Sequence, residues 1–423
     1  MVSSRPSIAR PERAAGRRAP WKLALLLLLV LAVGLVAAAA WQYSRPLPSV
    51  PATPLLDETI RIAGAAPPLP WPATGAAAVA VPELGVLGTH GDARPRPTAS
   101  TAKIMTALLV LEDHPLAPNE AGPSVTITPA DVEEYRAELR DGQSVVPVTA
   151  GEQLTEYQLL QGLLLPSGNN LAAVLARWDA GSVPAFVARL NVRAAALGMA
   201  STHFADASGY APQTVSTPGD LVLAAQAAMA NPVFAAIVAQ PQATLPVAGT
   251  VYNVNAILGQ NGIVGVKTGS TPEAGACFVF AAQQRVGDRA VMVFGAVMGE
   301  TRLADAFEAA RQLGPAVAAR LRTERVLARG QAVAAYRPPW GGEVPVVADE
   351  DVDLLVAPGL EVQTRLDLAA LDAPVAAGTP AGAVTLQLGA TSRQVAVHTG
   401  APLPLPGPRW RVTRALGPSG PTR

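Results

Sequence analysis

The stretch Pro97-Thr-Ala-Ser100-Thr-Ala-Lys103-Ile-Met-Thr106 decides how this chain is interpreted, because a hydroxyl and an amine lie three residues apart. Apolar residues follow at helical spacing, which predicts a helix here. Residues i and i+3 share a helix face, so the Lys103 amine can reach the Ser100 hydroxyl. Serine becomes a nucleophile only when a base takes its proton, and an amine does so once burial or a nearby cation lowers its pKa. Alone, the pair is equally typical of an exposed lysine on an amphipathic helix.

Lysine is rare in this chain. Among 32 Lys and Arg residues, only Lys22, Lys103 and Lys267 are lysines. Arginine stays protonated in proteins, whereas a desolvated lysine can lose its proton and act as a base. The two lysines that lie far from the N-terminus are therefore candidates for chemistry that arginine cannot perform.

Two further motifs carry polar side chains. Ser167-Gly-Asn169 follows Pro166 in a predicted turn between helices, where Ser, Gly and Asn are common for conformational reasons alone. The run Lys267-Thr268-Gly269-Ser270 ends a predicted strand. A lysine followed by a hydroxyl suits an anionic ligand, and a glycine lets that ligand approach the backbone. The simpler interpretation of the Lys267–Ser270 motif is a turn that ends the strand.

In combination, the three motifs occur in the order S-x-x-K, S-x-N and K-T-G, and the chain resembles the penicillin-recognising serine enzymes. From about residue 76 to 325 it is similar to the low-molecular-mass D-alanyl-D-alanine carboxypeptidases. Besides the stretch quoted first, three segments carry this resemblance: 164–170, 197–204 and 266–275. The resemblance implies an α/β (α+β) fold of the β-lactamase/transpeptidase type, with an antiparallel sheet flanked by helices and a helical subdomain. It implies neither a metal nor an organic cofactor.

The resemblance also implies three catalytic residues. Ser100 would be the acylated nucleophile and Lys103 its general base. Ser167 would relay a proton toward the leaving group. The reaction would remove the terminal D-alanine from peptidoglycan stem peptides ending in D-Ala-D-Ala, and β-lactams would trap the acyl-Ser100 intermediate as covalent inhibitors.

Five further residues would bind the substrate if the resemblance holds. Asn169 would hold the substrate amide, while Lys267 and Thr268 would bind the terminal carboxylate beside Gly269. The backbone N–H of Ser270 would form the oxyanion hole together with that of the nucleophile, which in acyl transfer is worth about 3–4 kcal/mol per donor. Lys267 would also help keep the base neutral.

Two departures from the family pattern stand out, at Val254, where some relatives carry an arginine, and in the tail, which has no amphipathic membrane-binding helix. Several alternatives also stay open. A DD-endopeptidase or transpeptidase would use the same residues. A class A-like β-lactamase needs a glutamate after the second motif, and residues 170–260 contain none. A non-catalytic cell-wall-binding protein would predict a damaged motif, and none is damaged.

Composition excludes other classes of protein. Positive and negative residues balance at 32 each and no basic stripe stands out in the body of the chain, which argues against nucleic-acid binding. The four histidines lie far apart and Cys277 is the single cysteine, so neither a zinc site nor an internal disulfide is expected.

The N-terminus carries an uninterrupted apolar run of 18 residues, Leu23–Ala40, after six basic residues and one acidic residue. As a helix it is about 27 Å long, close to the hydrocarbon thickness of a membrane. The positive-inside rule places the preceding segment in the cytoplasm. We therefore expect a single-pass cell-membrane protein with its catalytic domain on the extracytoplasmic face; the alternative is a cleaved signal peptide.

The expected organisation follows from shifts in composition. It comprises a cytoplasmic basic segment (1–22), a transmembrane anchor (23–41), a Pro-rich linker (42–75), the catalytic domain (76–325), a small all-β domain (331–416) and a disordered tail (417–423). A capping box at Thr149–Glu152 predicts a helix through Leu165. Strands are expected at 263–267, 276–283 and 290–297, and a closing helix at 305–321.

Overall fold

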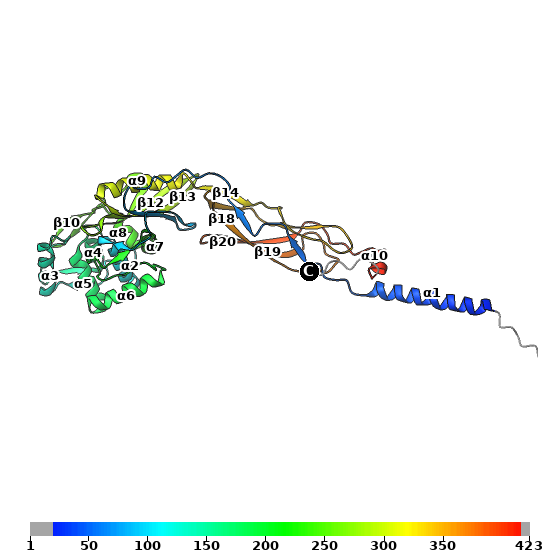
Figure 1. Cartoon of the computed structure of the whole chain (residues 1–423). Coiled ribbons are helices and arrows are strands. Elements are labelled where there is room, and N and C mark those ends of the chain that lie inside the picture. The colour runs from blue at the N-terminus through cyan, green and yellow to red at the C-terminus, as the bar shows by residue number, and fades with distance from the viewer. Residues whose placement is uncertain (1–19, 416–423) are drawn as a thin grey trace, which may run out of the picture.

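The computed structural model describes residues 20–415 and shows an elongated molecule (Figure 1). A unit of helices and sheet lies at one end and a β-rich unit in the middle. Helix α1 (Pro20–Ser44) projects from the other end. Most of the predicted cytoplasmic segment and the predicted disordered tail lie outside the described residues.

A five-stranded antiparallel sheet forms the centre of the first unit, in the order β11-β12-β13-β3-β4. Its strands are β3 (Ala76–Val81), β4 (Gly85–His90), β11 (Ile263–Thr271), β12 (Gly275–Val286) and β13 (Arg289–Glu300). Alternate residues of β12 enter two different cores: Cys277 and Val279 pack with the helices of one face, Phe278 and Phe280 with those of the other. Both faces are therefore covered, which explains the nearly continuous apolar runs in these strands.

Helices cover the two faces unequally. Helix α9 (Leu303–Ala318) packs on one face, against β12 and β13. The other face carries α7 (Pro218–Met229), which packs against α2 (Lys103–Asp113) and the helical subdomain beyond it. That subdomain contains α3 (Pro129–Arg140), α4 (Glu156–Leu164), α5 (Asn169–Ala180), α6 (Val183–Ala196) and α8 (Pro232–Val238). Three two-stranded pairs border it: β5 (Arg96–Pro97) with β8 (Val215–Ser216), β6 (Ser124–Thr126) with β7 (Gln153–Thr155), and β9 (Gln242–Leu245) with β10 (Gly249–Tyr252). The expected fold class is confirmed.

One helix start was predicted wrongly. Thr149–Glu152 forms a turn, in which the Glu152 carboxylate accepts the Thr149 N–H at 3.1 Å. Gly151 has a φ of 85°, a left-handed conformation that a helix cannot continue. The N-cap of helix α4 is Thr155, six residues after Thr149, and Thr155 forms the capping box with Gln158. Helices α3 and α8 were not anticipated.

The β-rich unit is built on a seven-stranded sheet, in the order β1-β15-β16-β20-β19-β18-β2. Five strands come from the tail: β15 (Ala332–Tyr336), β16 (Val344–Ala348), β18 (Glu361–Leu368), β19 (Pro380–Leu388) and β20 (Thr391–Thr399). The two edge strands, β1 (Ala52–Pro54) and β2 (Thr59–Arg61), come from the Pro-rich segment. Part of that segment therefore belongs to the sheet of the β-rich unit. The domain boundaries given above remain a proposal.

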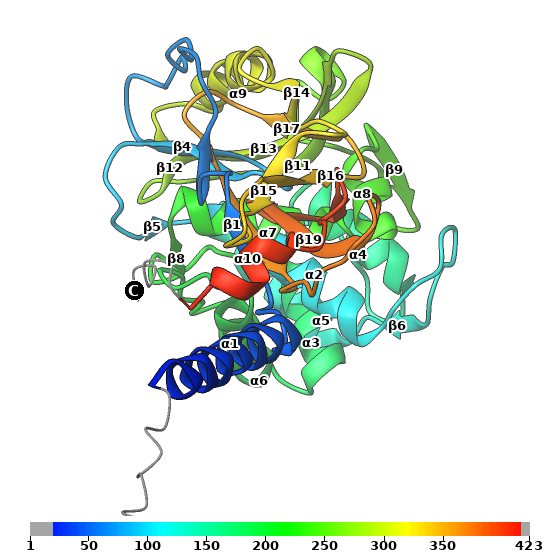
Figure 2. The same cartoon turned by 90° about the vertical axis from the view of Figure 1, so that its right-hand side faces the viewer.

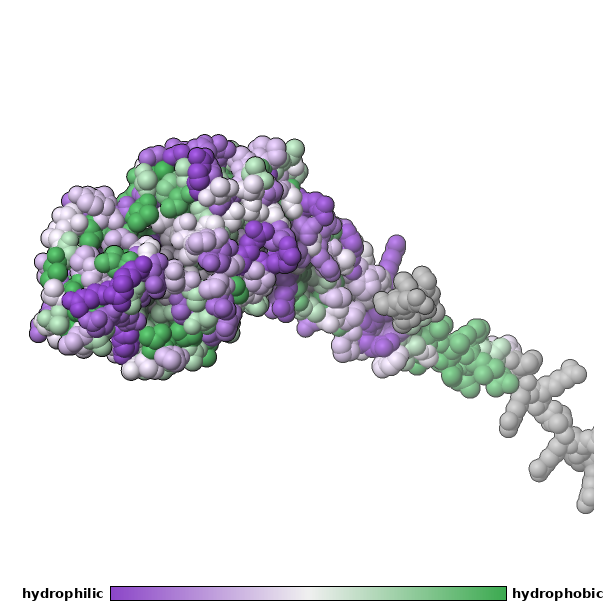
Figure 3. Space-filling view, turned by 60° about the vertical axis from the view of Figure 1, so that its left-hand side comes forward, coloured by the Kyte–Doolittle hydropathy of each residue, from purple (hydrophilic) through white to green (hydrophobic). Residues whose placement is uncertain are grey.

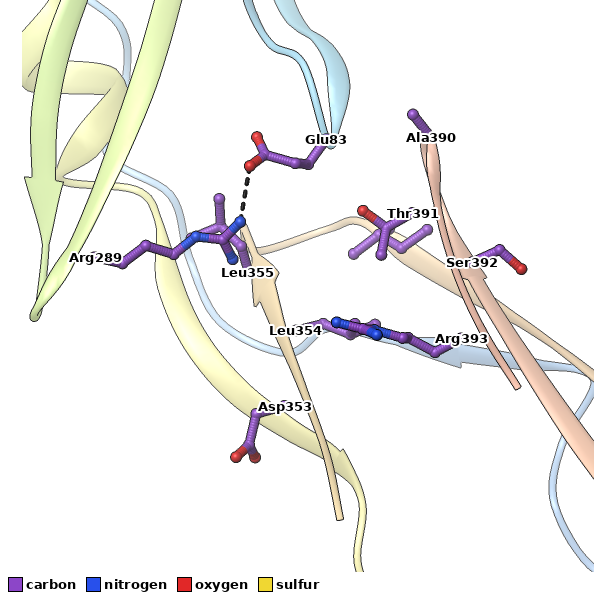
Figure 4. A pocket seen from close by; sticks show the side chains of 10 residues that line it. Glu83, Arg289, Asp353, Leu354, Leu355, Ala390, Thr391, Ser392 and Arg393 are labelled. Carbon is purple, nitrogen blue, oxygen red and sulfur yellow. Dashed lines mark hydrogen bonds and ion pairs between the residues drawn. The ribbon is translucent and has the colours of Figure 1, made fainter. Parts of the chain in front are cut away.

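The two units meet beside a hollow of about 350 Å³ (Figure 4). Across it, Arg289 at the start of β13 donates to Glu83 at 2.8 Å, next to Leu355 of β17 (Val352–Val356). Strand β17 pairs with β14 (Arg322–Leu327), which is the first strand after helix α9. No predicted site residue lines this hollow.

Candidate active site

Ser100 lies in a short 3-10 helix, η1 (Ala99–Ala102), directly before α2. Strand β11 passes close to it: a Cβ added to Gly269 would lie 2.7 Å from the Ser100 backbone nitrogen. Only glycine allows the strand and the helix start to approach this closely. Gly269, the residue before Ser270, therefore lies directly against the backbone of η1.

Lys103 is fully buried on the first turn of α2 and makes three contacts. Its Nζ lies 2.7 Å from the Ser100 Oγ and 3.2 Å from the Ser167 Oγ, and it contacts the Asn169 Oδ1. A neutral amine has two donors and one lone pair. It can therefore donate to Ser167 and Asn169 while its lone pair accepts the hydroxyl proton of Ser100.

Ser167 and Asn169 reach this position from the turn between α4 and α5. Ser167 has a φ of 71°, which is uncommon for a residue other than glycine, and is 5% exposed. Such backbone strain persists only where its surroundings impose it, and it clusters at functional sites. The N–H of Gly168 donates to the Gly162 carbonyl at 2.9 Å, which fixes the turn.

Lys267 and Thr268 lie on β11, one of the two outer strands of its sheet within residues 20–415. Both side chains are buried, and the Lys267 Nζ donates to the Thr268 carbonyl at 3.0 Å. One edge of β11 pairs with β12, and the strand packs against η1 on the Ser100 side. An outer strand can pair with an extended peptide through its backbone, which would carry a peptide carbonyl toward the nucleophile.

The electrostatics favour neutral amines. Burial lowers the pKa of Lys103 well below its usual range, and the positive charge of Lys267 lowers it further, against the opposing effect of Asp206 and Glu138. Burial lowers the pKa of Lys267 to about 7. A lysine whose pKa approaches the working pH can act as a general base. The arrangement can thus activate a serine and, with Lys267 protonated, bind a carboxylate.

The structure brings Ser100, Lys103, Ser167 and Asn169 into contact and places β11 against them. It also adds Gln143, which the sequence analysis missed. The Gln143 Oε1 accepts the Asn169 Nδ2 hydrogen bond at 2.7 Å, and the Ser144 carbonyl accepts the Asn169 backbone N–H at 2.8 Å. These two bonds set the orientation of the Asn169 amide, so that its oxygen faces Lys103.

Glu138 and Asp206 also act on the site. The Glu138 backbone carbonyl accepts the Gln143 N–H at 3.0 Å, and burial raises the pKa of its carboxyl to about 7. Asp206 accepts hydrogen bonds from Ser208 and Thr214 in the loop beneath η1. No motif marked either residue.

Other candidates have ordinary roles. Val254 is 40% exposed, and its side chain carries no charge. The histidine at position 203 forms an isolated backbone bridge with Val215. Cys277 is buried in β12 opposite Gly269, and burial raises the pKa of its thiol to about 11. Among residues 20–415 no three His, Cys, Asp or Glu side chains are grouped to hold a metal.

Comparison with known proteins gives a family for this site. A model of the D-alanyl-D-alanine carboxypeptidase family matches residues 78–300, a range that contains all three motifs. The D-alanyl-D-alanine carboxypeptidase DacB2 of Mycobacterium tuberculosis is 40% identical over 210 residues, covering 48% of this chain and 67% of its own length. A D-alanyl-D-alanine carboxypeptidase of a Streptomyces strain is 34% identical over 262 residues, 55% of this chain and 86% of that protein.

Solved structures are similar as well. The crystal structure of a Streptomyces DD-transpeptidase matches with a TM-score of 0.52 and 31% identity, covering 60% of this chain and 98% of that one. The D-alanyl-D-alanine carboxypeptidase DacD of Francisella tularensis has a TM-score of 0.59 over 83% of this chain and 97% of its own, at 20% identity. At that identity the match establishes the fold alone.

Proposed function

The chain belongs to the D-alanyl-D-alanine carboxypeptidase family, as a serine hydrolase of the carboxypeptidase type, and from this premise we propose how its residues perform the reaction. The 2.7 Å contact between the Lys103 Nζ and the Ser100 Oγ, inside a buried site that lowers the pKa of the amine, carries the proposal. Neutral Lys103 takes the hydroxyl proton, and Oγ attacks the carbonyl carbon of the D-Ala-D-Ala peptide bond.

The substrate is held while this bond forms. Protonated Lys267 and the Thr268 hydroxyl bind the terminal carboxylate, and the Asn169 amide holds the peptide group. The negative charge that develops on the carbonyl oxygen is stabilised by the backbone N–H groups of Ser100 and Ser270, which costs no reorganisation because both are fixed in η1 and β11.

Two proton transfers complete acylation and hydrolysis. The proton on Lys103 passes through the Ser167 hydroxyl, 3.2 Å away, to the amide nitrogen of the leaving D-alanine, and the C–N bond breaks. Water then attacks the acyl-Ser100 ester with Lys103 again as the base, which releases the shortened stem peptide and restores the serine. A β-lactam would acylate Ser100 in the same way, but its leaving nitrogen stays tethered in the opened ring.

The choice of acyl acceptor separates a carboxypeptidase from a transpeptidase or endopeptidase. Water and an amine compete for the same acyl-Ser100. Of the similar Streptomyces proteins, one is named a carboxypeptidase and another a DD-transpeptidase. Adding a D-amino acid to a D-Ala-D-Ala peptide assay measures the competition. We expect hydrolysis to dominate; a product consisting mainly of the exchanged peptide would assign transpeptidation.

We also propose that α1 anchors the protein in the membrane and leaves the catalytic unit outside. Within residues 20–415, one straight helix is long and apolar enough to cross a membrane, Trp21–Ser44. Its apolar stretch is not buried by the rest of the protein. Two bent helix pairs also pass that test jointly, but their residues contribute to the core around α2. Protease digestion of sealed cells would leave the body of the protein intact if it faced the cytoplasm, contrary to this proposal.

Intact mass after incubation with a penicillin tests the reaction directly, with Ser100→Ala as the control. A persistent single adduct on the native chain alone supports acyl-Ser100. Consumption of the drug without an adduct would indicate a β-lactamase. Survival of the drug without an adduct would favour an inert cell-wall-binding protein.

A further inference from the structure

A group of cations and aromatic rings surrounds the outer end of α1, where the short helix α10 (Pro408–Thr413) packs against it (Figure 2). We call this group the juxtamembrane cluster; its members are Trp41, Tyr43, Arg45, Arg409, Trp410, Arg411 and Arg414. It is assembled from both ends of the described chain. Its position relative to a membrane follows from α1, since the apolar run ends at Ala40 and the cluster begins with the next residue.

Specific contacts hold the cluster in place. Arg414 donates to the carbonyls of Gln42, Arg45 and Pro46 at 2.8, 2.9 and 3.1 Å. Carbonyls in the last turn of a helix have no intrahelical donor, and a cation is favoured there by the helix dipole. The indole N–H of Trp410 donates to the Pro339 carbonyl at 3.1 Å and ties α10 to the β-rich unit. The guanidinium of Arg411 lies over the Tyr43 ring, 5.0 Å from its centroid.

The segments that contribute the cluster contain no acidic residue. No Asp or Glu occurs between Gln42 and Leu56 or from Ala373 to the C-terminus, so the four arginines lie in segments that carry no negative charge. Arg409 is exposed and Arg411 half-buried. Arg45, Arg414 and Trp410 also line a hollow of about 390 Å³ beside the end of α1.

Apolar and aromatic groups face solvent around these cations. Trp41 is 64% exposed, Tyr43 45%, Leu405 48% and Val412 36%. In Figure 3 the exposed surface of α1 forms a continuous hydrophobic stem that ends at the more hydrophilic β-rich unit. Aromatic rings are enriched at the level of the lipid headgroups, and arginines near an anionic membrane surface gain affinity for it.

We propose that the juxtamembrane cluster binds the phosphate of an anionic phospholipid in the leaflet that surrounds the outer end of α1. The lipid phosphate would lie among Arg45, Arg409 and Arg411, with its acyl chains along α1. Arg414 positions the cluster, because both of its terminal guanidinium nitrogens already donate to backbone carbonyls. This inference does not depend on the reaction at Ser100.

The test uses the full chain in detergent, with bound lipids counted by native mass spectrometry. Phosphatidylglycerol and phosphatidylcholine with the same acyl chains are titrated separately. We expect the native chain to prefer the anionic lipid, and R409Q/R411Q to bind it about 10- to 30-fold more weakly. The control R285Q/R393Q removes two exposed arginines elsewhere and should bind the anionic lipid like the native chain.

Three results would overturn the proposal. The first is equal binding of the two lipids by the native chain, which needs no variant and so does not depend on folding. The second is equal binding of phosphatidylglycerol by the native chain and R409Q/R411Q when both form the penicillin adduct. The third is displacement of phosphatidylglycerol by inorganic phosphate at the same concentration, which would indicate a site for free phosphate.

Discussion

Gln143 offers a sharp test of the site because it reaches the catalytic base only through Asn169. Its side-chain oxygen accepts the Asn169 Nδ2 hydrogen bond at 2.7 Å, and the Asn169 oxygen contacts Lys103. In Gln143→Leu the buried amide donor loses this partner, which costs about 1–3 kcal/mol. If acylation requires the present orientation of Asn169, that free energy raises the barrier and slows acylation about 5- to 150-fold.

Gln143→Glu is the matched variant, because it keeps an acceptor oxygen and adds a negative charge. A carboxylate near Lys103 favours the protonated amine and raises the pKa of Lys103. The acid limb of the acylation rate should therefore move to higher pH, and the rate should recover toward the native value in alkaline solution. In Gln143→Leu the rate should instead stay low across the whole pH range.

The assay is the second-order rate of β-lactam acylation between about pH 5 and 10, followed by intact mass. Thermal unfolding of each variant checks the fold. The reasoning fails if Gln143→Leu is acylated at the native rate, or if the two variants show the same pH profile. The first result would mean that Asn169 is held in place without Gln143, and the second that a charge at position 143 does not act on the Lys103 amine.

Three further outcomes follow from the two buried lysines. Lys103→Arg should slow acylation by at least about 100-fold, because arginine cannot give up its proton; appreciable acylation would refute the base. Lys267→Ala should weaken peptides with a free terminal carboxylate far more than their amidated analogues, and equal losses would remove the carboxylate role. Because burial lowers the pKa of Lys267 to about 7, the unfolded chain binds its proton more readily from there up to the usual lysine pKa. Lys267 should thus contribute about 1.4 kcal/mol per pH unit to the rise of the unfolding free energy in that window, and a urea titration in which Lys267→Met keeps the native slope would contradict this.

Much of the site could be predicted because its parts are locally encoded. The three-residue spacing of Ser100 and Lys103 is a property of any helical turn, and the structure preserves it although the nucleophile lies in a 3-10 turn. The meeting of Ser167 and Lys267 with this pair is not local, since each comes from a separate element. Those contacts were anticipated only through the resemblance in motif order.

The misses have physical causes. Gln143 lies in a loop 26 residues before Asn169, and nothing in its residue type distinguishes it from other surface glutamines. Two sequences near α4 have the form of a capping box, and only the second, Thr155–Gln158, opens the helix. The chain turns at Gly151, and Glu152 also accepts the Val247 N–H at 3.2 Å, so tertiary contacts use that carboxylate elsewhere. Strands β1 and β2 are three residues long, too short for an alternating pattern to predict.

The electrostatics of the site explain why lysine and not arginine occurs at these two positions. Lys103 and Lys267 are both buried, and the charge of the second helps to lower the pKa of the first. Two arginines in these places would carry two permanent buried charges, which is far more costly than amines that can become neutral. The Lys267 Nζ donates to a neutral carbonyl, so a substrate carboxylate would supply the opposite charge and favour its protonated form. The substrate would bring one negative charge, and Lys267 would take up one proton as the substrate binds. The net charge near Lys103 would then stay the same, so the base could stay neutral while the carboxylate is held.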